Sequence, residues 1–146
     1  MQVIKDKQVV ANDWVYVVEA GEFNQTANFS VPVELWLQHK AALLAHTGKI
    51  GVRINPNDDI AQIADDLQKL AIIELDFPIF TDGRLFSQAQ LLRGKYGFTG
   101  EIRAVGNFMP DQMYYLSRVG VNAFALEDAQ VALGLACLED FSVNYQ

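Results

Sequence analysis

An α/β fold with a parallel sheet is predicted by two features of the sequence: a recurring alternation of strands and helices, and strands that are apolar. Short apolar runs begin near residues 50, 72, 101 and 123, and a segment with helical spacing follows each of them. Consecutive βα units with apolar strands are typical of a parallel sheet covered by helices. Right-handed crossovers then allow two architectures, an open doubly wound sheet or a half-barrel of four units, and the sequence does not separate them.

Residues 1–30 are expected to form an N-terminal β extension to this sheet. Val3-Ile4 and Val9-Val10 are β-prone, and Trp14 to Val18 is a β-branched and aromatic run. Asn12-Asp13 is typical of a turn, so we expect a short strand pair followed by a polar loop over residues 21–28. The length of 146 residues and the lack of a linker predict a single domain over residues 1–146.

The first two helices are predicted by their capping residues. Ser30 and Pro32 are typical of a helix start, and Gly48 is placed to end that helix before a strand at 49–54. Asn57-Asp58-Asp59 then opens a second helix with acidic charge at the positive end of its dipole, and an apolar stripe carries this helix to Leu70.

The remaining units follow the same logic. The third strand covers residues 72–80, and its helix ends near Gly97. A strand at 101–105 precedes a helix from Pro110 to Gly120, and a short strand at 123–126 precedes a last helix that Asp128 caps.

Composition and charge limit the classes of partner. The net charge of -7 disfavours binding to a phosphate backbone and to anionic membrane surfaces, so we expect no nucleic-acid or membrane partner. No stretch approaches the roughly 18 apolar residues of a membrane span, and the N-terminus lacks the apolar segment of a signal peptide. The single cysteine, Cys137, suits a reducing compartment, so we expect a cytoplasmic protein. The 51% of hydrophobic residues predicts a homodimer.

Candidate ligand-binding residues follow the strands, because ligands of such sheets bind beyond the carboxyl ends of the strands. These polar strand ends are termed the strand rim here. The most conspicuous segment is the turn TDGR at residues 81–84, where Asp and Arg accompany the glycine that a turn needs. The candidate ligand-binding residues are Asp82, Gly83, Arg84, Arg103, Asn107, Asp111 and Gln112.

Two interpretations of this set remain open. In the first, Arg84 binds an anion or carboxylate in a bidentate manner, and Asp82 orients Arg84 or acts as a base. In the second, Asp82-Gly83 makes the turn and Arg84 pairs with Asp82 or Asp111 across the rim. Both interpretations place Asp82, Arg84, Arg103 and Asp111 in one charged cluster. Arg53 and Arg103 lie within strands, so each needs a partner for its charge.

No cofactor and no metal are predicted, and no residue is assigned as catalytic. Glycine-rich nucleotide-binding motifs, a G-x-S-x-G elbow and a C-x-x-C pair are all absent from the sequence. His39 and His46 are seven residues apart on one expected helix, which is not the spacing of a metal pair.

The chain resembles one bacterial family in several segments that occur in the family's order. They are GVRINPNDDI, IELDFPIFTDGR, FSQAQLLR, FTGEIRAVGN, DQMYYLSRVGVNAF and FSVNYQ. The family is domain-of-unknown-function family 934, members of which are sometimes labelled oxidoreductases. The resemblance covers about Asp13 to Gln146 and includes the TDGR turn. Asn107 departs from it, since the family usually has Asp there, and this departure weakens any mechanism that needs a carboxylate at that position.

The resemblance implies a genomic association with sulfite reductase and assimilatory sulfate reduction. We therefore expect an accessory protein of sulfite reduction, with sulfite reductase or another sulfate-assimilation enzyme as its partner. The first alternative is a small anion-binding enzyme or oxidoreductase that uses the charged rim at the TDGR turn. The second is an oligomeric scaffold whose rim charges only pair internally.

Overall fold

The computed structural model describes residues 2–23, 28–79 and 83–144, with side chains as far as Leu138. Its strands are β1 (Gln2–Lys5), β2 (Gln8–Val10), β3 (Val15–Tyr16), β4 (Phe29–Pro32), β5 (Ile50–Ile54), β6 (Ile72–Phe77), β7 (Glu101–Gly106) and β8 (Ala123–Leu126). The α-helices are α1 (Val33–Leu44), α2 (Arg84–Gln90), α3 (Met113–Arg118) and α4 (Val131–Asn144). Shorter or irregular helices are η1 (Ala20–Glu22), η2 (Ile60–Lys69), η3 (Leu91–Lys95), η4 (Pro110–Gln112) and η5 (Asp128–Gln130).

The strands of the described residues form one sheet in the order β2-β1-β8-β7-β6-β5-β4-β3. The strands from β3 to β8 pair in parallel, whereas β1 pairs antiparallel with both β2 and β8. The predicted α/β class and the parallel pairing of the strands near 50, 72, 101 and 123 are therefore confirmed.

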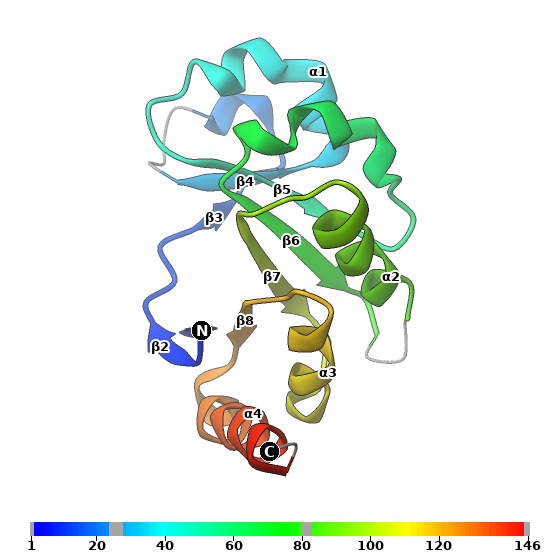
Figure 1. The fold of residues 1–146 in the computed structure, drawn as a ribbon. Helices are drawn as coiled ribbons and strands as arrows, with labels where there is room; N and C mark the ends of the chain where they lie inside the picture. The colour runs from blue at the N-terminus through cyan, green and yellow to red at the C-terminus, as the bar shows by residue number, and fades with distance from the viewer. Residues whose placement is uncertain (1, 24–27, 80–82, 145–146) are drawn as a thin grey trace.

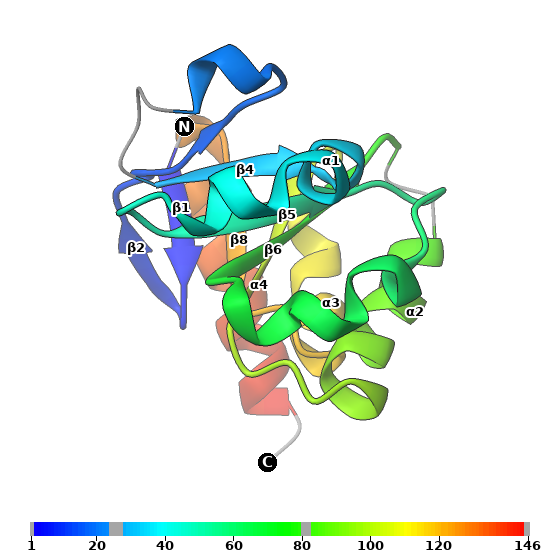
Figure 2. The ribbon, with the colours of Figure 1, turned by 90° about the horizontal axis from the view of Figure 1, so that it is seen from above.

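The sheet is a curled half-barrel, which decides between the two architectures that the sequence allowed. Figure 1 shows α1, α2, α3 and α4 following one another around the outside of the sheet, while the segment joining β2 to β3 passes along the other side. From above, β1 and β2 run in a clearly different direction from β4 and β5, as expected for a strongly curled sheet (Figure 2).

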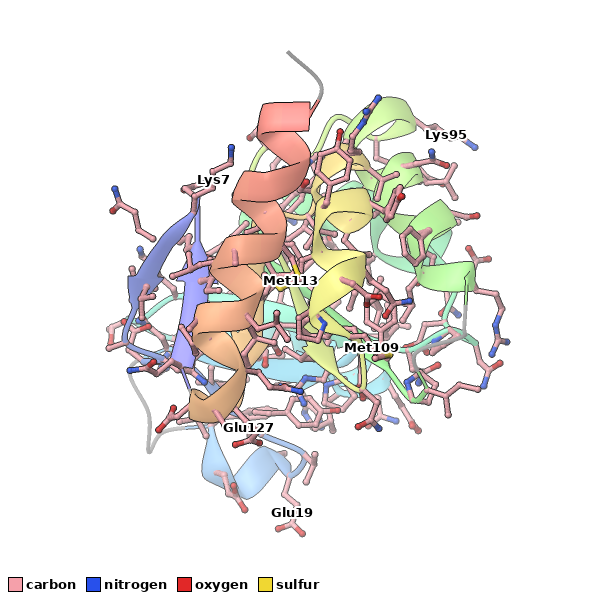
Figure 3. The ribbon with its side chains drawn as sticks, turned by 90° about the horizontal axis from the view of Figure 1, so that it is seen from below. Lys7, Glu19, Lys95, Met109, Met113 and Glu127 are labelled. Carbon is pink, nitrogen blue, oxygen red and sulfur yellow. The ribbon has the colours of Figure 1, made fainter. Side chains whose placement is uncertain are left out.

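The hydrophobic core lies between the helices and the convex face of the sheet. Every second residue of each central strand enters it, for example Val52 and Ile54 of β5 and Ile73 and Leu75 of β6. Trp36 of α1 is fully buried there, and its indole N–H donates to Asp66 of η2 at 3.0 Å. Figure 3 shows Met113, the first residue of α3, between α3 and α4. These contacts join neighbouring helices within the layer on the convex face.

The N-terminal extension differs in detail from the expectation. A strand pair exists, but it turns at Asp6-Lys7, where both residues have the positive φ that a two-residue hairpin loop requires. Asn12-Asp13 is not the turn of this strand pair but lies in the connection between the two edge strands, where the Asn12 side chain accepts a hydrogen bond from the backbone N–H of Trp14 at 3.1 Å, as in an Asx turn. β3 pairs with β4 at the opposite edge of the sheet from β2.

The helix start expected at Ser30 is also wrong. Phe29–Pro32 form strand β4, and α1 begins at Val33, directly after the proline. The Ser30 hydroxyl does not cap a helix; it donates to the carboxylate of Glu74 on β6. The segment Ser30-Val31-Pro32 is locally compatible with a helix cap and with a buried strand. It forms a strand here because it pairs with β5.

Candidate functional site

A row of polar side chains crosses the concave face of the sheet, opposite the helices. Arg53 of β5 is in register with Glu74 of β6, and Glu74 is in register with Arg103 of β7. Because successive residues of a strand face opposite sides, these positions alternate with core residues such as Leu75 and Ala104. The concave face is therefore charged across the middle strands, whereas the convex face is apolar.

One half of this row is a network around Glu74, which is 3% exposed. Its carboxylate accepts a hydrogen bond from the Ser30 hydroxyl and pairs with the Arg53 guanidinium at 3.0 Å. The guanidinium also lies over the ring of Tyr16, 3.9 Å from the ring centroid. Burial raises the pKa of the Tyr16 phenol, and the Asp76 and Glu74 carboxylates reinforce this against Arg53. The phenol is therefore protonated at neutral pH.

Asp76 lies one alternation further along β6, close to the carboxyl end of the strand. Burial raises the pKa of its carboxyl; the Arg53 charge opposes the shift and the Glu74 charge adds to it. Within the described residues, this carboxylate forms no hydrogen bond and no ion pair. Gly106 accommodates it, since a Cβ at position 106 would lie 2.6 Å from Asp76 Oδ1. A half-buried carboxyl with a raised pKa beside an arginine is suited to proton transfer.

The other half of the row lies towards the amino ends of the strands. The Glu101 carboxylate pairs with Arg103 at 2.7 Å and with Lys5 of β1 at 3.1 Å. Arg103 also donates to the side-chain oxygen of Asn12 at 3.2 Å. Asn12 belongs to the connection between β2 and β3, so this hydrogen bond ties that connection to the concave face.

A pocket of about 320 Å³ lies at this amino end. Lys5, Lys49, Arg103 and Glu101 contribute charged groups to its wall, and Trp14 contributes an aromatic ring. These residues come from separate stretches of the chain, so the pocket exists only in the folded protein. Its size is at the lower end of the range typical of small-molecule sites, roughly 300–1,000 Å³.

The strand rim holds most of the residues predicted as ligand-binding. Arg84 donates to Asn57 at 2.9 Å, and the Asn107 side chain donates to the carbonyl of Pro78 at 2.9 Å. The Gln112 side chain accepts from the backbone N–H of Met109 at 2.8 Å, which is a helix-capping role. These contacts join loops at the carboxyl edge of the sheet.

The remaining rim candidates are placed less fully. Gly83 directly precedes α2, and Asp111 lies in the first turn of η4. Asp82 lies outside the described residues. Their binding of a ligand stays a prediction.

Arg103 does not join the rim, so the expected cluster of Asp82, Arg84, Arg103 and Asp111 is wrong for Arg103. Its side chain turns back towards Glu101, two residues earlier in the same strand, and is held there by Asn12. The expectation that Arg53 and Arg103 need partners is confirmed by Glu74 and Glu101.

The sequence did contain a signal for the concave row. In the strand sequences GVRI, IELD and EIRAV, the charged residues fall on alternate positions. A strand that helices cover on both faces would be apolar throughout. Alternating charges in three neighbouring parallel strands therefore indicate a sheet with one face free of helices, with Glu74 and Asp76 on that face. Tyr16, Ser30 and Lys49 carry no comparable signal, because only the fold brings them to it.

Arg93, which belongs to one of the family's segments, has a structural role. Its guanidinium donates to the carbonyls of Phe98, Gly100 and Gly120 at 2.8, 2.7 and 3.0 Å. It thus fastens the loop after η3 to the turn between α3 and β8.

The geometry describes an α/β half-barrel protein with a charged concave face. No group of three or more metal-binding side chains occurs among the described residues, and no helix found in them is long and apolar enough to cross a membrane. Residues 51–146 match the family "Bacterial protein of unknown function (DUF934)", so the chain belongs to this family. The match confirms the resemblance over residues 51–146, which contain every segment quoted for it, and begins within β5; residues 13–50, which the resemblance also included, lie outside the match. No curated protein matches the chain.

The Arg53–Glu74 pair is predicted to stabilise the fold mainly by mutual compensation. Arg53→Met leaves Glu74 buried and without its cation, which should cost about 3–5 kcal/mol of unfolding free energy. In the double variant Arg53→Met/Glu74→Leu no charge is left unpaired, so most of this loss should be recovered. Urea unfolding of both variants and of Glu74→Leu measures the coupling; additive losses would show that the two groups do not form a pair.

Asp76→Asn is predicted to raise the melting temperature at pH 7. A raised pKa means that the folded state binds the proton more tightly than the unfolded state does. Stability therefore falls as the pH rises above the ordinary value of 3.8, and the loss is complete once the pH exceeds the folded pKa. The difference between the variant and the wild type should disappear below the ordinary value of 3.8. Thermal unfolding from pH 3 to pH 8 measures it. Asp65→Asn, on an exposed residue of η2, is the control and should show no such trend. An Asp76→Asn protein less stable than wild type at pH 7 would contradict the prediction.

Proposed function

We propose that this protein is an accessory protein of assimilatory sulfite reduction. The observation that carries the proposal is its membership of the DUF934 family, because the resemblance to that family implies a genomic association with sulfite reductase. The proposed partner is sulfite reductase or another sulfate-assimilation enzyme, the proposed location is the cytoplasm, and the proposed assembly is a homodimer. The single cysteine suits a reducing compartment, and the apolar composition suits a dimer.

The concave face is the candidate site of action that we propose for this role. Asp76 is half-buried and has no hydrogen bond or ion pair among the described residues, so burial raises the pKa of its carboxyl and its charged form is expected to lower stability. Proteins keep unfavourable groups of this kind most often where function needs them. We therefore propose that the carboxyl end of the concave face, around Asp76 and Arg53, contacts the reactant or the partner on which the protein acts.

A second candidate function is a small anion-binding enzyme, with oxidoreductase chemistry as one version of it. The observation that favours it is a half-buried carboxyl, Asp76, on the same face of the sheet as Arg53, which is in register with Glu74 two residues earlier on β6. In this version Arg53 attracts an anionic substrate and Asp76 exchanges a proton with it. The rim residues Gly83, Arg84, Asn107, Asp111 and Gln112 remain the candidate ligand contacts at the same edge of the sheet.

Deletion of the gene is predicted to slow growth of the native bacterium on sulfate as sole sulfur source. Sulfide or cysteine should restore growth, because both enter after sulfite reduction. A plasmid copy of the wild-type gene should restore growth on sulfate, and so should the matched control Asp65→Asn. Asp76→Asn should fail to do so although its protein is stable. Growth rates on the three sulfur sources measure the effect.

Two results would contradict the proposal. Equal growth of the deletion strain on sulfate and on cysteine would remove the link to sulfite reduction. Full complementation by Asp76→Asn would show that the proposed site around Asp76 on the concave face is not needed for the function. Affinity purification from the native bacterium then separates the candidates: co-purification of sulfite reductase subunits is expected for an accessory protein, whereas a free-standing enzyme would not retain them.

A further inference from the structure

We propose that the pocket at the amino ends of the strands binds a small organic anion. The inference concerns the opposite end of the concave face from Asp76 and does not depend on the proposed function. It rests on three features of the described residues: the charges around the pocket, the donors that Arg103 leaves unused, and the apolar part of the wall.

Positive charge is concentrated at this pocket in an otherwise acidic protein. Lys5, Lys49 and Arg103 line it, and they are three of only 11 Lys and Arg residues in a chain of net charge -7. The carboxylates in the wall are Asp13 and Glu101. Three cations and two carboxylates leave a formal charge of +1, and the pocket therefore favours an anion.

The hydrogen bonds of Arg103 leave donors available. The residue is 3% exposed, and its Nε and Nη1 atoms donate to Glu101 and Asn12. Within the described residues, Nη2 has no hydrogen-bond partner. A guanidinium with available N–H donors can bind carboxylate, sulfonate or phosphate groups through two parallel hydrogen bonds.

Lys49 adds a second cation, which is not paired with a carboxylate of the described residues. Its backbone N–H donates to the side chain of Asn28, but its ammonium group forms no ion pair within the described residues. Lys5, in contrast, is paired with Glu101. Arg103 and Lys49 are therefore the two groups best placed to hold an anionic head.

The size and the apolar wall indicate an organic ligand. The volume of about 320 Å³ exceeds what a sulfate or phosphate ion alone fills, and Val10, Trp14 and Ala71 give part of the wall an apolar surface. A flat apolar group can lie against the Trp14 ring while its anionic head contacts Arg103. The ligand class is thus a monoanionic or dianionic molecule with a small apolar body.

The position differs from the usual site of a barrel, where the amino end of the strands serves stability. Here the connection between β2 and β3 crosses that end, and Asn12 is bonded to Arg103 below it. Ala11, Asp13 and Trp14 of this connection line the pocket.

Phenyl phosphate is the probe that tests this inference, with benzyl alcohol as its neutral counterpart. Titration of the full chain with phenyl phosphate should change tryptophan fluorescence and reach saturation, because Trp14 lines the pocket. Trp14→Phe should remove most of the fluorescence change while a thermal-shift assay still reports binding. Benzyl alcohol should bind at least tenfold more weakly, and added salt should weaken phenyl phosphate binding.

Lys49→Gln provides the decisive variant because Lys49 is exposed and its loss should leave the fold intact. It should raise the Kd for phenyl phosphate roughly tenfold, the value expected when a charged hydrogen-bond donor is lost. Lys95→Gln is the matched control: Lys95 points to solvent from the end of η3, away from the pocket (Figure 3), and its loss should not change the Kd. No saturable binding of phenyl phosphate, equal binding of benzyl alcohol, or an unchanged Kd in Lys49→Gln would overturn the inference.

Discussion

The connection between β2 and β3 is the constraint on which the rest of the structure depends. These strands are the two edges of the eight-stranded sheet formed by the described residues, yet only Ala11–Trp14 separate them along the chain. Eight strands side by side in a flat sheet would span about 34 Å, given a spacing of roughly 4.8 Å. The five steps from Val10 to Val15 reach at most about 18 Å. The sheet must therefore curl until its edges approach each other.

The curl explains why the two faces differ. Helices occupy the convex side, where the βα crossovers place them, and the concave side becomes too narrow for a second helical layer (Figure 1). Gly51, Ala123 and Ala125 keep part of this interior small; a Cβ at position 51 would lie 2.1 Å from the Ile72 side chain. The charged residues that face inward pair with one another, since isolated charges there would be costly. Asp76, which has no such partner among the described residues, is the exception with functional interest.

The sequence predicted the four central strands because each is a short apolar run bounded by turn or capping residues. It could not choose between an open sheet and a half-barrel, since both use the same βα repeat. β4 was missed because Ser30 and Pro32 suit a helix cap as well as a strand, and the deciding partner, Glu74, lies 44 residues away. Local patterns do not contain such pairings.

The candidate site was predicted in part for a similar reason. Residues that follow the strands, such as Arg84 and Asn107, were placed correctly at the carboxyl edge, because a parallel sheet fixes where strand ends meet. The direction of the Arg103 side chain could not be predicted, since it depends on Glu101 and on Asn12. Lys49 and Trp14 reach the amino-end pocket only through the curl of the sheet, which no short segment specifies.

The position of the 11–14 connection over the concave face is the central claim, and paramagnetic relaxation in solution tests it most directly. A nitroxide attached to an Ala11→Cys variant, with Cys137→Ser as background, should broaden the amide signals of Lys49, Ala71 and Glu101, whose residues line the same pocket as Ala11. The amides of Ala89 and Leu116, buried in the helices of the convex side, should remain sharp. Sharp signals from Lys49, Ala71 and Glu101 would contradict the account, because the edges of the sheet would then not enclose its concave face.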